Sequence, residues 1–550
     1  MPTRSGISIL ALLLLALMFL LAGGAALRES VTIDAVAHIG AGVSYLQKLD
    51  LRYNEEHPPL AKVLAALPLV MRGIHADYSG VMWSASRDFF PAYLAEWVFG
   101  EYVLTRWNSP QSTLAWARLP MLLLTIALGW VVFVCARRLG GDWGGLLCLG
   151  VYASTPVFLV FGPLVLTDIA ITFFSLLALL AMARLWDRPD RKNTLLMALA
   201  LAGAVLTKFT GAILFFVFIA VALSTRWRPI AGQPAAKPDA RQWRRLRWRA
   251  MRKATLWAAL VVYAVYFLLS WNQPLNIPGL AGHGSLAALL GRLLMPPWLF
   301  LCGLAFVVIT GNRATFILGH AYPHGIWLSI LLLAPLPRLL GRIRRMAPKL
   351  AWASGALVVL LGASCLVTAV RAYPTYFPYI NPLASGHPAY WLVNDSNLDW
   401  NQALPEVERF ARQHGLKDVP LDMYGFSDST AFVPQSRLWD CQAPSAADAG
   451  QWAVLSANMI LDGHNCEWLM QYPHEPLAGG GMFAVQLPAT IPPAGTPGGP
   501  PPVAARRIFL GLPFEMRQLF QGLVRRPDDI PKVLADMRAT FEKQMQAKKK

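Results

Sequence analysis

The chain has 550 residues, of which 55% are hydrophobic and only 15% are charged. A soluble protein carries about 25% charged residues, so this composition excludes an ordinary soluble enzyme and indicates a membrane protein. The net charge of +18 does not indicate nucleic acid binding, because the basic residues gather in short loops between apolar runs. That distribution is typical of the cytoplasmic loops of a membrane protein.

The first apolar run, residues 7–27, is long enough for one membrane-spanning helix. A signal peptide is the alternative, because small residues occur at Ala22–Ala26. The length of the run favours an uncleaved helix with its N-terminus in the cytoplasm. Residues 29–114 would then form a first outer loop. Within that loop, 60–72 and 89–104 are expected to be amphipathic helices on the membrane surface.

Later apolar runs predict about nine spans in all. The most basic loop, residues 226–253, is expected in the cytoplasm. The run 297–311 is short and follows two prolines, so we expect it to be interfacial or re-entrant; if it spanned, the basic residues after it would face outside. The other spans are expected at about 115–135, 143–162, 164–186, 194–207, 209–225, 254–271, 326–341 and 350–370.

The C-terminal third has the composition of a soluble domain. Residues 372–487 predict a small extracytoplasmic α/β domain, with a helix at 402–414 and strands in VPLDMYGF, WAVLSANMIL and MFAVQLP. Residues 488–504 are a Pro- and Gly-rich linker, and 505–550 predict a basic amphipathic tail that lies on a membrane or binds a partner. In an oxidising compartment, Cys441 and Cys466 of this domain would be able to pair.

The stretch DAVAHIGAGVSYLQKLDLRYNEEHPPLAK, residues 34–62, concentrates acids and histidines in the first outer loop. No Asp or Glu occurs between Asp239 and Asp395, so a catalytic carboxylate of the membrane domain must lie early in the chain. A solvated loop is the alternative interpretation. The ionisable candidates of this stretch are Asp34, His38, Glu55, Glu56 and His57.

Further ionisable groups occur near the expected outer ends of helices. Asp168 in LVLTDIAITFF either takes part in catalysis or braces a neighbouring helix. Lys208 in LTKFTG either extends to the surface or binds an anion such as a lipid phosphate. The segment NRATFILGHAYPHG adds donors, and DSNLDWNQ would bind a sugar or a cation, or simply cap a turn. These two segments contain Arg313, His320 and His324, and Asp395 and Asp399.

In their order and spacing, these segments resemble the lipid-carrier-dependent glycosyltransferases of the C-type membrane fold. That family includes the protein O-mannosyltransferases and the aminoarabinose transferases of lipid A. The resemblance covers residues 1–371 and implies transfer of a sugar from a polyprenyl-phosphate carrier, with inversion, to a glycan, lipid or protein acceptor. It also implies a multi-pass protein of the inner membrane, with the active site and the C-terminal domain on the periplasmic side.

The resemblance also implies roles for residues. Asp34 matches the family's base, although Ala35 stands where the family usually has a second acid. Glu56 matches an acid that helps to hold a divalent metal ion in the aminoarabinose transferases, with His320 or His324 completing the site. Asp168 is a further catalytic candidate. His57, Lys208 and Arg313 would bind the donor phosphate.

Two other functions compete with this one. A transporter or flippase of lipid-linked sugars would line a path through the membrane with charge and usually has repeated halves, which the sequence lacks. A non-catalytic membrane scaffold would tolerate substitutions at Asp34, Glu56 and Asp168. No nucleotide-binding fingerprint occurs, which favours a lipid-linked donor over a nucleotide sugar.

Overall fold

The structure is a computed structural model, and the chain in it divides into two compact units. The first unit contains Met1–Phe19, Ala41–Arg72 and Leu119–Leu366, and the second contains Leu20–Gly40, Gly73–Arg118 and Val367–Lys550. The structure describes residues 4–84, 89–223, 240–275, 277, 284–310, 329–380, 386–393, 395–425, 427–460, 466–502, 514–533, 535–536 and 539.

Helices make up most of the described chain before residue 372. Their bounds are α1 Arg4–Ala26, α2 Ile33–Lys48, α3 Leu60–Met71, α4 Val81–Ser84, α5 Phe89–Glu101, α6 Pro110–Ser154, α7 Pro156–Phe161, α8 Asp168–Asp187, α9 Arg191–Thr207, α10 Ile213–Leu223, α11 Ala240–Leu269, α12 Gly284–Thr310, α14 Leu336–Met346 and α15 Pro348–Arg371. A π-helix, η2 Tyr102–Arg106, continues α5, and a 3-10 turn, η3 Phe209–Ala212, precedes α10.

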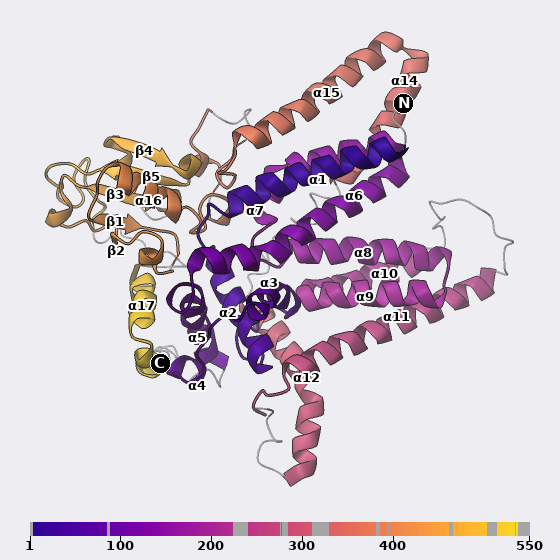
Figure 1. Ribbon diagram of the computed structural model, residues 1–550, viewed down its shortest axis with the longest axis horizontal. Helices are drawn as coiled ribbons and strands as arrows, with labels where there is room; N and C mark the ends of the chain where they lie inside the picture. The colour runs from indigo at the N-terminus through magenta and orange to yellow at the C-terminus, as the bar shows by residue number, and fades with distance from the viewer. Residues whose placement is uncertain are drawn as a thin grey trace, which may run out of the picture. The chain divides into compact units, whose positions relative to one another are not determined.

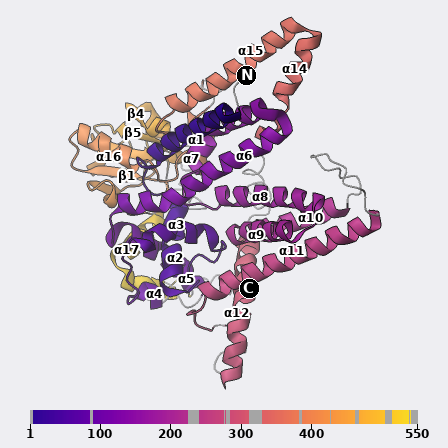
Figure 2. The same ribbon diagram turned by 45° about the vertical axis from the view of Figure 1, so that its right-hand side comes forward.

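Helices α8, α9 and α11 lie side by side in the first unit (Figures 1 and 2). The turn between α8 and α9 is short because Asp190 caps α9, accepting a hydrogen bond from the Asn193 N–H at 2.8 Å. Alanines and methionines fill the core between the three helices. An ideal Cβ on Gly203 would lie 2.3 Å from Phe174, so only glycine allows this close approach. Small residues at such contacts are typical of helices packed in a membrane.

Six described helices are long and apolar enough to cross a membrane. These candidate spans are Gly6–Ala26, Pro110–Ser154, Asp168–Asp187, Arg244–Leu269, Ser285–Ala305 and Trp352–Arg371. Large apolar side chains lie exposed along several of them; on α15, Trp352 is 73% exposed and Val359 is 70% exposed. Such surfaces suit lipid rather than water. The expected count of nine spans exceeds the six that qualify among the described residues.

Several expected helices have different bounds. Of the run 297–311, residues 297–310 are part of α12, a helix of 27 residues that contains Pro296 and Pro297, so the expectation that the helix is short is wrong. Residues 115–162 form α6, which bends at Gly141 (φ 77°), and the separate α7. The expected helix at 326–341 is interrupted by a turn at 333–335 before α14.

Two expected loops contain helices instead. Asp34 and His38 do not share a loop with Glu55, because residues 33–48 form α2. The second half of the basic loop, from Ala240 onward, is the start of α11. Helices are present where 60–72 and 89–104 were expected, as α3 and as α5 with η2; their position on the membrane surface stays a prediction.

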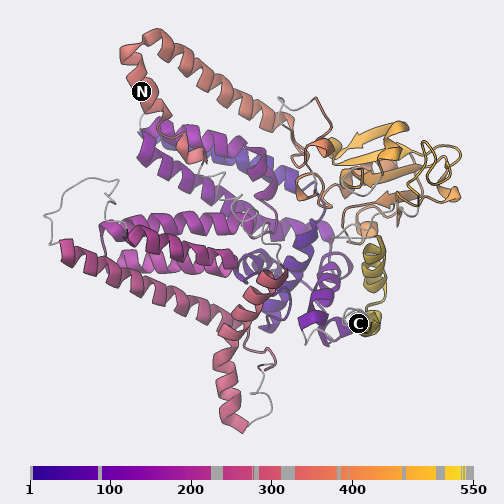
Figure 3. The same cartoon turned by 180° about the vertical axis from the view of Figure 1, so that it is seen from behind.

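The C-terminal domain of the second unit contains a mixed five-stranded sheet in the order β2-β1-β3-β5-β4. Figure 3 shows this domain from behind. Strand β1 pairs in parallel with β2 and β3, whereas β3, β5 and β4 are antiparallel. Helix α16 packs its apolar face on this sheet. The bounds are α16 Leu404–Gln413, β1 Val419–Asp422, β2 Ser436–Leu438, β3 Trp452–Ser456, β4 His474–Leu477 and β5 Met482–Gln486.

The structure joins Cys441 and Cys466 in a disulfide within this domain. Residues 488–502 contain no helix or strand, in keeping with the expected linker. In the tail, α17 (Phe514–Arg525) packs beside α5, and the Tyr102 hydroxyl donates to the carbonyl of Val524 at 2.8 Å. This part of the tail therefore has a partner within its own unit.

Candidate functional site

In the first unit, Lys62 organises the loop that carries Glu55, Glu56 and His57. The Lys62 side chain is fully buried at the start of α3. Its ammonium group donates to the carbonyls of Asn54 (2.5 Å) and His57 (2.7 Å), to the Asn54 side chain (3.0 Å) and to the Tyr45 hydroxyl (3.1 Å). Asn54 itself has φ 52°. One buried charge thus fixes the backbone on both sides of the two glutamates.

The two glutamates of this loop lie in a partly desolvated environment. Burial raises the pKa of Glu55 to about 7; Lys62 lowers it and Asp50 raises it. Burial also raises the pKa of Glu56, and the Asn54 side chain, which donates to Glu56 Oε1 at 3.1 Å, and the charge of Lys62 both oppose this shift. Carboxyl groups with raised pKa values are common at functional sites. The raised pKa values of Glu55 and Glu56 therefore make these two carboxyl groups candidates for a functional role.

Helix α12 and the turn after Lys208 both reach this loop at Gly303. An ideal Cβ on Gly303 would lie 2.4 Å from the Glu55 carbonyl oxygen and 2.7 Å from Phe209 Cζ. Phe209 packs edge-to-face on Phe300, with ring centroids 5.1 Å apart. The end of α11 also anchors the loop, because Gln273 accepts from the Leu51 N–H at 3.0 Å. Residues 49–57 are thus contacted by α12 and by the segment that follows α11, and Phe209 packs on the same part of α12.

Asp168 and Lys208 form an ion pair at 3.0 Å. Asp168 lies in the first turn of α8, and Lys208 directly follows the end of α9. The helix dipoles favour an anion at the first position and a cation at the second. The Lys208 side chain is only 12% exposed, whereas that of Asp168 is 35% exposed. Because Phe209 follows Lys208, this pair lies in the same region of the first unit as Glu55.

A metal ion is implied by the resemblance, and of its expected ligands Glu56 is described. Glu56 and His57 offer a carboxylate oxygen and an imidazole nitrogen within 4.8 Å of each other, and both are ligand types that zinc and similar ions accept. Glu56 and His57 are therefore suitable as part of the ligand set of such a metal site. The other expected ligands, His320 and His324, and the phosphate-binding candidate Arg313 lie outside the described residues.

In the second unit, Asp34 is half-buried in the first turn of α2, and His38 is buried one turn later. The segment before Asp34 is held on two sides. The Arg118 guanidinium donates to the carbonyls of Ala26, Glu29 (3.0 Å) and Ser30 (2.5 Å). This support gives the start of α2 a fixed position within its unit.

The other support comes from the DSNLDWNQ segment of the C-terminal domain. The Ser30 N–H donates to the Gln402 carbonyl at 2.9 Å, and the Ser30 hydroxyl donates to the Asn401 carbonyl at 2.6 Å. The Ile33 N–H donates to the Trp400 carbonyl at 3.3 Å. The side chain of Asp395 lies outside the described part of the chain, and Asp399 is fully buried.

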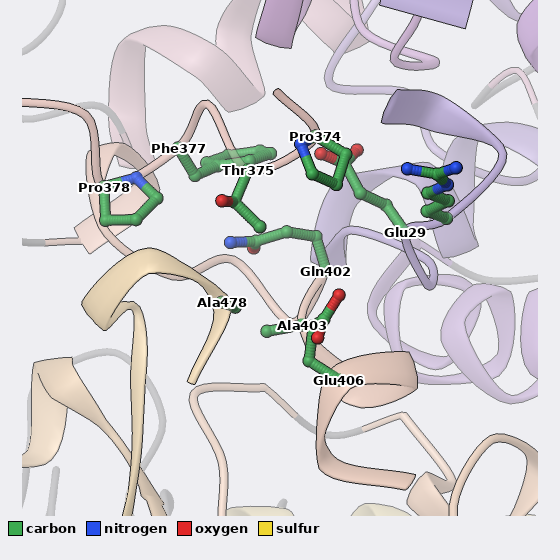
Figure 4. Close-up of a pocket in the computed structure, with 10 residues that line it drawn as sticks. Glu29, Pro374, Thr375, Phe377, Pro378, Gln402, Ala403, Glu406 and Ala478 are labelled. Atoms are coloured by element: carbon green, nitrogen blue, oxygen red, sulfur yellow. The ribbon is translucent and has the colours of Figure 1, made fainter. Parts of the chain in front are cut away.

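The second unit also contains a pocket that is partly open to solvent. Figure 4 shows the carboxylates of Glu29 and Glu406 and the amide of Gln402 among its lining side chains. Burial raises the pKa of Glu29 to about 7, and Arg118 opposes the shift. Prolines and the ring of Phe377 form the apolar part of the lining.

The fold and these sites define a mostly helical, multi-pass membrane protein with a small C-terminal sheet domain. Residues 111–237 match the model of the dolichyl-phosphate-mannose-protein mannosyltransferase family. The chain is therefore similar to glycosyltransferases that use lipid-linked sugars, and the matched part contains both Asp168 and Lys208. Asp34 and Glu56 precede it.

Two other comparisons add little. No curated protein matches the sequence. Among solved structures, the Archaeoglobus fulgidus oligosaccharyltransferase in complex with zinc and sulfate is 12% identical, with 83% of this chain and 69% of that chain covered and a TM-score of 0.30. A TM-score this low does not establish a common fold.

Several residues around these sites were not singled out from the sequence. Lys62 was quoted within EEHPPLAK but given no role, although a single lysine in an otherwise apolar helix start is an unusual placement. Arg118 and Gly303 have no local sequence signal, because their contacts are made by segments distant in the chain. The pocket acid Glu29 likewise depends on burial that only the fold creates.

Proposed function

We propose that this protein transfers a sugar from a polyprenyl-phosphate carrier to an acceptor on the outer face of the inner membrane. The observation that carries the proposal is the grouping of Lys208, its partner Asp168 and the Glu55–His57 loop in one region of the helical unit. Lys208 and Asp168 also lie in the stretch that matches the mannosyltransferase family. Ionisable groups within a membrane protein are functional-site candidates, and a cation among them suits a phosphate-bearing substrate.

The donor phosphate is assigned to Lys208, His57 and Arg313. The charge on the leaving phosphate grows as its bond to the sugar breaks, so a fixed cation stabilises the transition state more than the ground state. Asp168 would act as a positioning residue that holds the Lys208 ammonium group. A divalent ion held by Glu56, with His320 or His324, would supply further positive charge to the phosphate. Exposed apolar side chains of the spans would receive the isoprenoid tail.

Asp34 is assigned the role of general base. Its carboxylate would accept the proton of an acceptor hydroxyl while that oxygen bonds to the anomeric carbon of the sugar. The bond from that carbon to the carrier phosphate oxygen breaks in the same step, and the phosphate leaves with the bonding electrons. A single displacement of this kind inverts the anomeric carbon. A positioned base contributes roughly 10²–10⁴-fold to such a rate.

The test is transfer of label from radiolabelled polyprenyl-phosphate sugars to a cell-envelope acceptor fraction by purified protein. We expect wild type to transfer label and Asp34→Asn to lose at least roughly 100-fold of the rate. The matched control is Asp77→Asn, because Asp77 is an exposed aspartate of the same outer region. Near-normal transfer by Asp34→Asn would remove Asp34 from the mechanism, and no transfer by wild type from any donor would contradict the proposed function.

A further inference from the structure

Three buried side-chain oxygens of the second unit have no hydrogen-bond partner among the described residues: Thr32 Oγ1, Asp399 Oδ2 and Asn401 Oδ1. Thr32 and Asp399 are 0% exposed, and Asn401 is 2% exposed. Leaving one such oxygen unsatisfied destabilises the fold, and more so where the group is charged. Three such oxygens on two neighbouring stretches of the chain point to a ligand or bound species.

The three oxygens belong to two stretches that are bonded to each other. The Ile33 N–H donates to the Trp400 carbonyl at 3.3 Å, and the Asn401 side-chain NH₂ donates to the Val31 carbonyl at 3.2 Å. The second bond fixes the orientation of the Asn401 amide, because the Val31 carbonyl can only accept. The unpartnered atom of Asn401 is therefore its oxygen. In the sequence, residues 395, 397, 399 and 401 all carry side-chain oxygens at alternate positions.

Asp399 has no described cation to balance its charge. Its Oδ1 accepts from the Asn401 N–H at 3.1 Å, and Ser456 donates a further hydrogen bond to the carboxyl group. Burial raises the pKa of Asp399 to about 7, and no Lys or Arg is among the groups that act on it. A buried carboxylate needs either a proton or a nearby cation.

Thr32 directly precedes α2, where a threonine usually caps the helix with its hydroxyl. Here the Ala35 N–H donates to the backbone carbonyl of Thr32 instead, at 3.1 Å. The Thr32 hydroxyl is therefore not used by the helix. It is a neutral oxygen beside the Val31 carbonyl, to which Asn401 donates.

We propose that Asp399, Asn401 and Thr32 are ligands of a calcium ion that joins the C-terminal domain to the start of α2. A donor set of oxygens alone suits a hard cation such as calcium. With one carboxylate, the affinity should be that of extracellular modules, on the order of 10⁻⁴–10⁻³ M. The Cys441–Cys466 disulfide of the same domain agrees with an oxidising compartment outside the cytoplasm. This site does not depend on the sugar-transfer reaction.

The experiment is a terbium titration of the full-length protein in detergent, followed by competition with calcium. Trp400 lies between Asp399 and Asn401 in the sequence, so excitation of tryptophan should sensitise terbium bound there. We expect one equivalent of terbium with saturable luminescence, displaced by calcium. Asp399→Asn should weaken binding at least about tenfold, because even outer partners of metal sites have effects of that size. The control Asp418→Asn removes an exposed carboxylate of the same domain and should bind like wild type.

A second readout separates binding from misfolding. Calcium should raise the melting temperature of wild type and of Trp400→Phe, whereas only wild type should show the strong luminescence. Thr32→Ala, a milder change than Asp399→Asn, should reduce the calcium effect without preventing folding. Absence of saturable terbium binding to folded wild type would overturn the proposal. So would equal binding by wild type and a folded Asp399→Asn, since that outcome means the buried carboxyl group is protonated instead.

Discussion

The loop around Lys62 and the segment around Asp399 both contain buried acids, but they balance them differently. In the first unit, a buried lysine lies next to Glu55 and Glu56 and donates to four oxygens around them. In the second unit, Asp399 has only neutral donors among the described residues. The first arrangement is complete in the chain itself, whereas the second needs a proton or a cation from outside. Local charge balance thus distinguishes a prearranged site from one that must recruit a ligand.

Removing the internal cation should have the largest effect. Lys62→Met would leave the Asn54 and His57 carbonyls without their buried donor and the glutamates without compensation, so we expect a loss of about 3–5 kcal/mol of unfolding free energy. The melting temperature in detergent and the elution profile in size-exclusion chromatography measure it. Lys417→Met, at an exposed lysine of the C-terminal domain, is the control. An equally small change in both variants would show that Lys62 does not organise the loop.

Glu101 is a buried acid of the second unit whose contribution to stability should depend on pH. The Glu101 carboxyl accepts from the Asp428 N–H at 3.0 Å and from Thr105, and its Oε2 has no described partner. Burial raises its pKa to about 7; the hydrogen bonds from the Asp428 N–H and from Thr105 lower it, the charge of Asp428 raises it, and Arg106 lowers it. Because the folded pKa exceeds the unfolded one, its stabilising contribution is complete below pH 4.5 and is lost as pH rises through 7.

Glu101→Gln should therefore remove a fall in stability of about 3 kcal/mol between pH 4.5 and 8, since one pKa unit corresponds to about 1.4 kcal/mol. Glutamine keeps an oxygen for the Asp428 N–H and cannot ionise. Melting temperatures across this pH range give the slope. The exposed Glu475→Gln should leave the slope of wild type unchanged. The prediction fails if Glu101→Gln and wild type lose stability in parallel.

The backbone contact behind the lysine loop should show a smaller effect. Gly303→Ala places a methyl group against the Glu55 carbonyl and Phe209, which must shift, so we expect a loss of about 1–3 kcal/mol. Gly355→Ala in α15 meets no atom within 4 Å and should be neutral or slightly stabilising, because alanine favours a helix. Equal melting temperatures for the two variants would mean that α12 does not support the loop.

The sequence predicted the helical part well where long apolar runs stand between charged turns, as at α8, α9 and α15. It failed at α2, whose acid and histidine were interpreted as loop residues although its apolar positions follow a helical period. It failed at α12, because Pro296 and Pro297 were taken as a boundary, whereas membrane helices tolerate internal prolines. Strands β2 and β4 are too short and too poor in apolar residues for a period to be visible.

Within the sites, residues in a motif were easier to find than residues in a tertiary contact. Asp168 and Lys208 stood out because charge near the end of an apolar helix is costly and therefore informative. Their pairing across 40 residues, and the clamp that Arg118 forms on residues 26–30, depend on how distant segments pack. No local pattern encodes such contacts, which is why Lys62, Gly303 and Arg118 emerged only from the structure.

The Asp168–Lys208 pair should have the smallest effect on stability and a clear one on activity. The pair is partly exposed, so Asp168→Asn should cost less than about 1 kcal/mol. If Lys208 binds the donor phosphate, Lys208→Met should lower transfer roughly 100- to 1,000-fold, as loss of a charge-stabilising donor does. Asp168→Asn leaves that cation in place but less well oriented, so its loss should be smaller, up to roughly 100-fold.

The Arg137–Asp142 pair provides the control, because the Asp142 side chain is exposed to an extent similar to that of Asp168, 40% against 35%. Asp142→Asn should match Asp168→Asn in stability and wild type in transfer rate. The double variant of Asp168 and Lys208 should be no slower than Lys208→Met alone, since a positioning residue has no function once the group it positions is gone. Independent, multiplying losses would instead mean that Asp168 touches the substrate itself, and the carboxylate would then have to be counted among the catalytic residues.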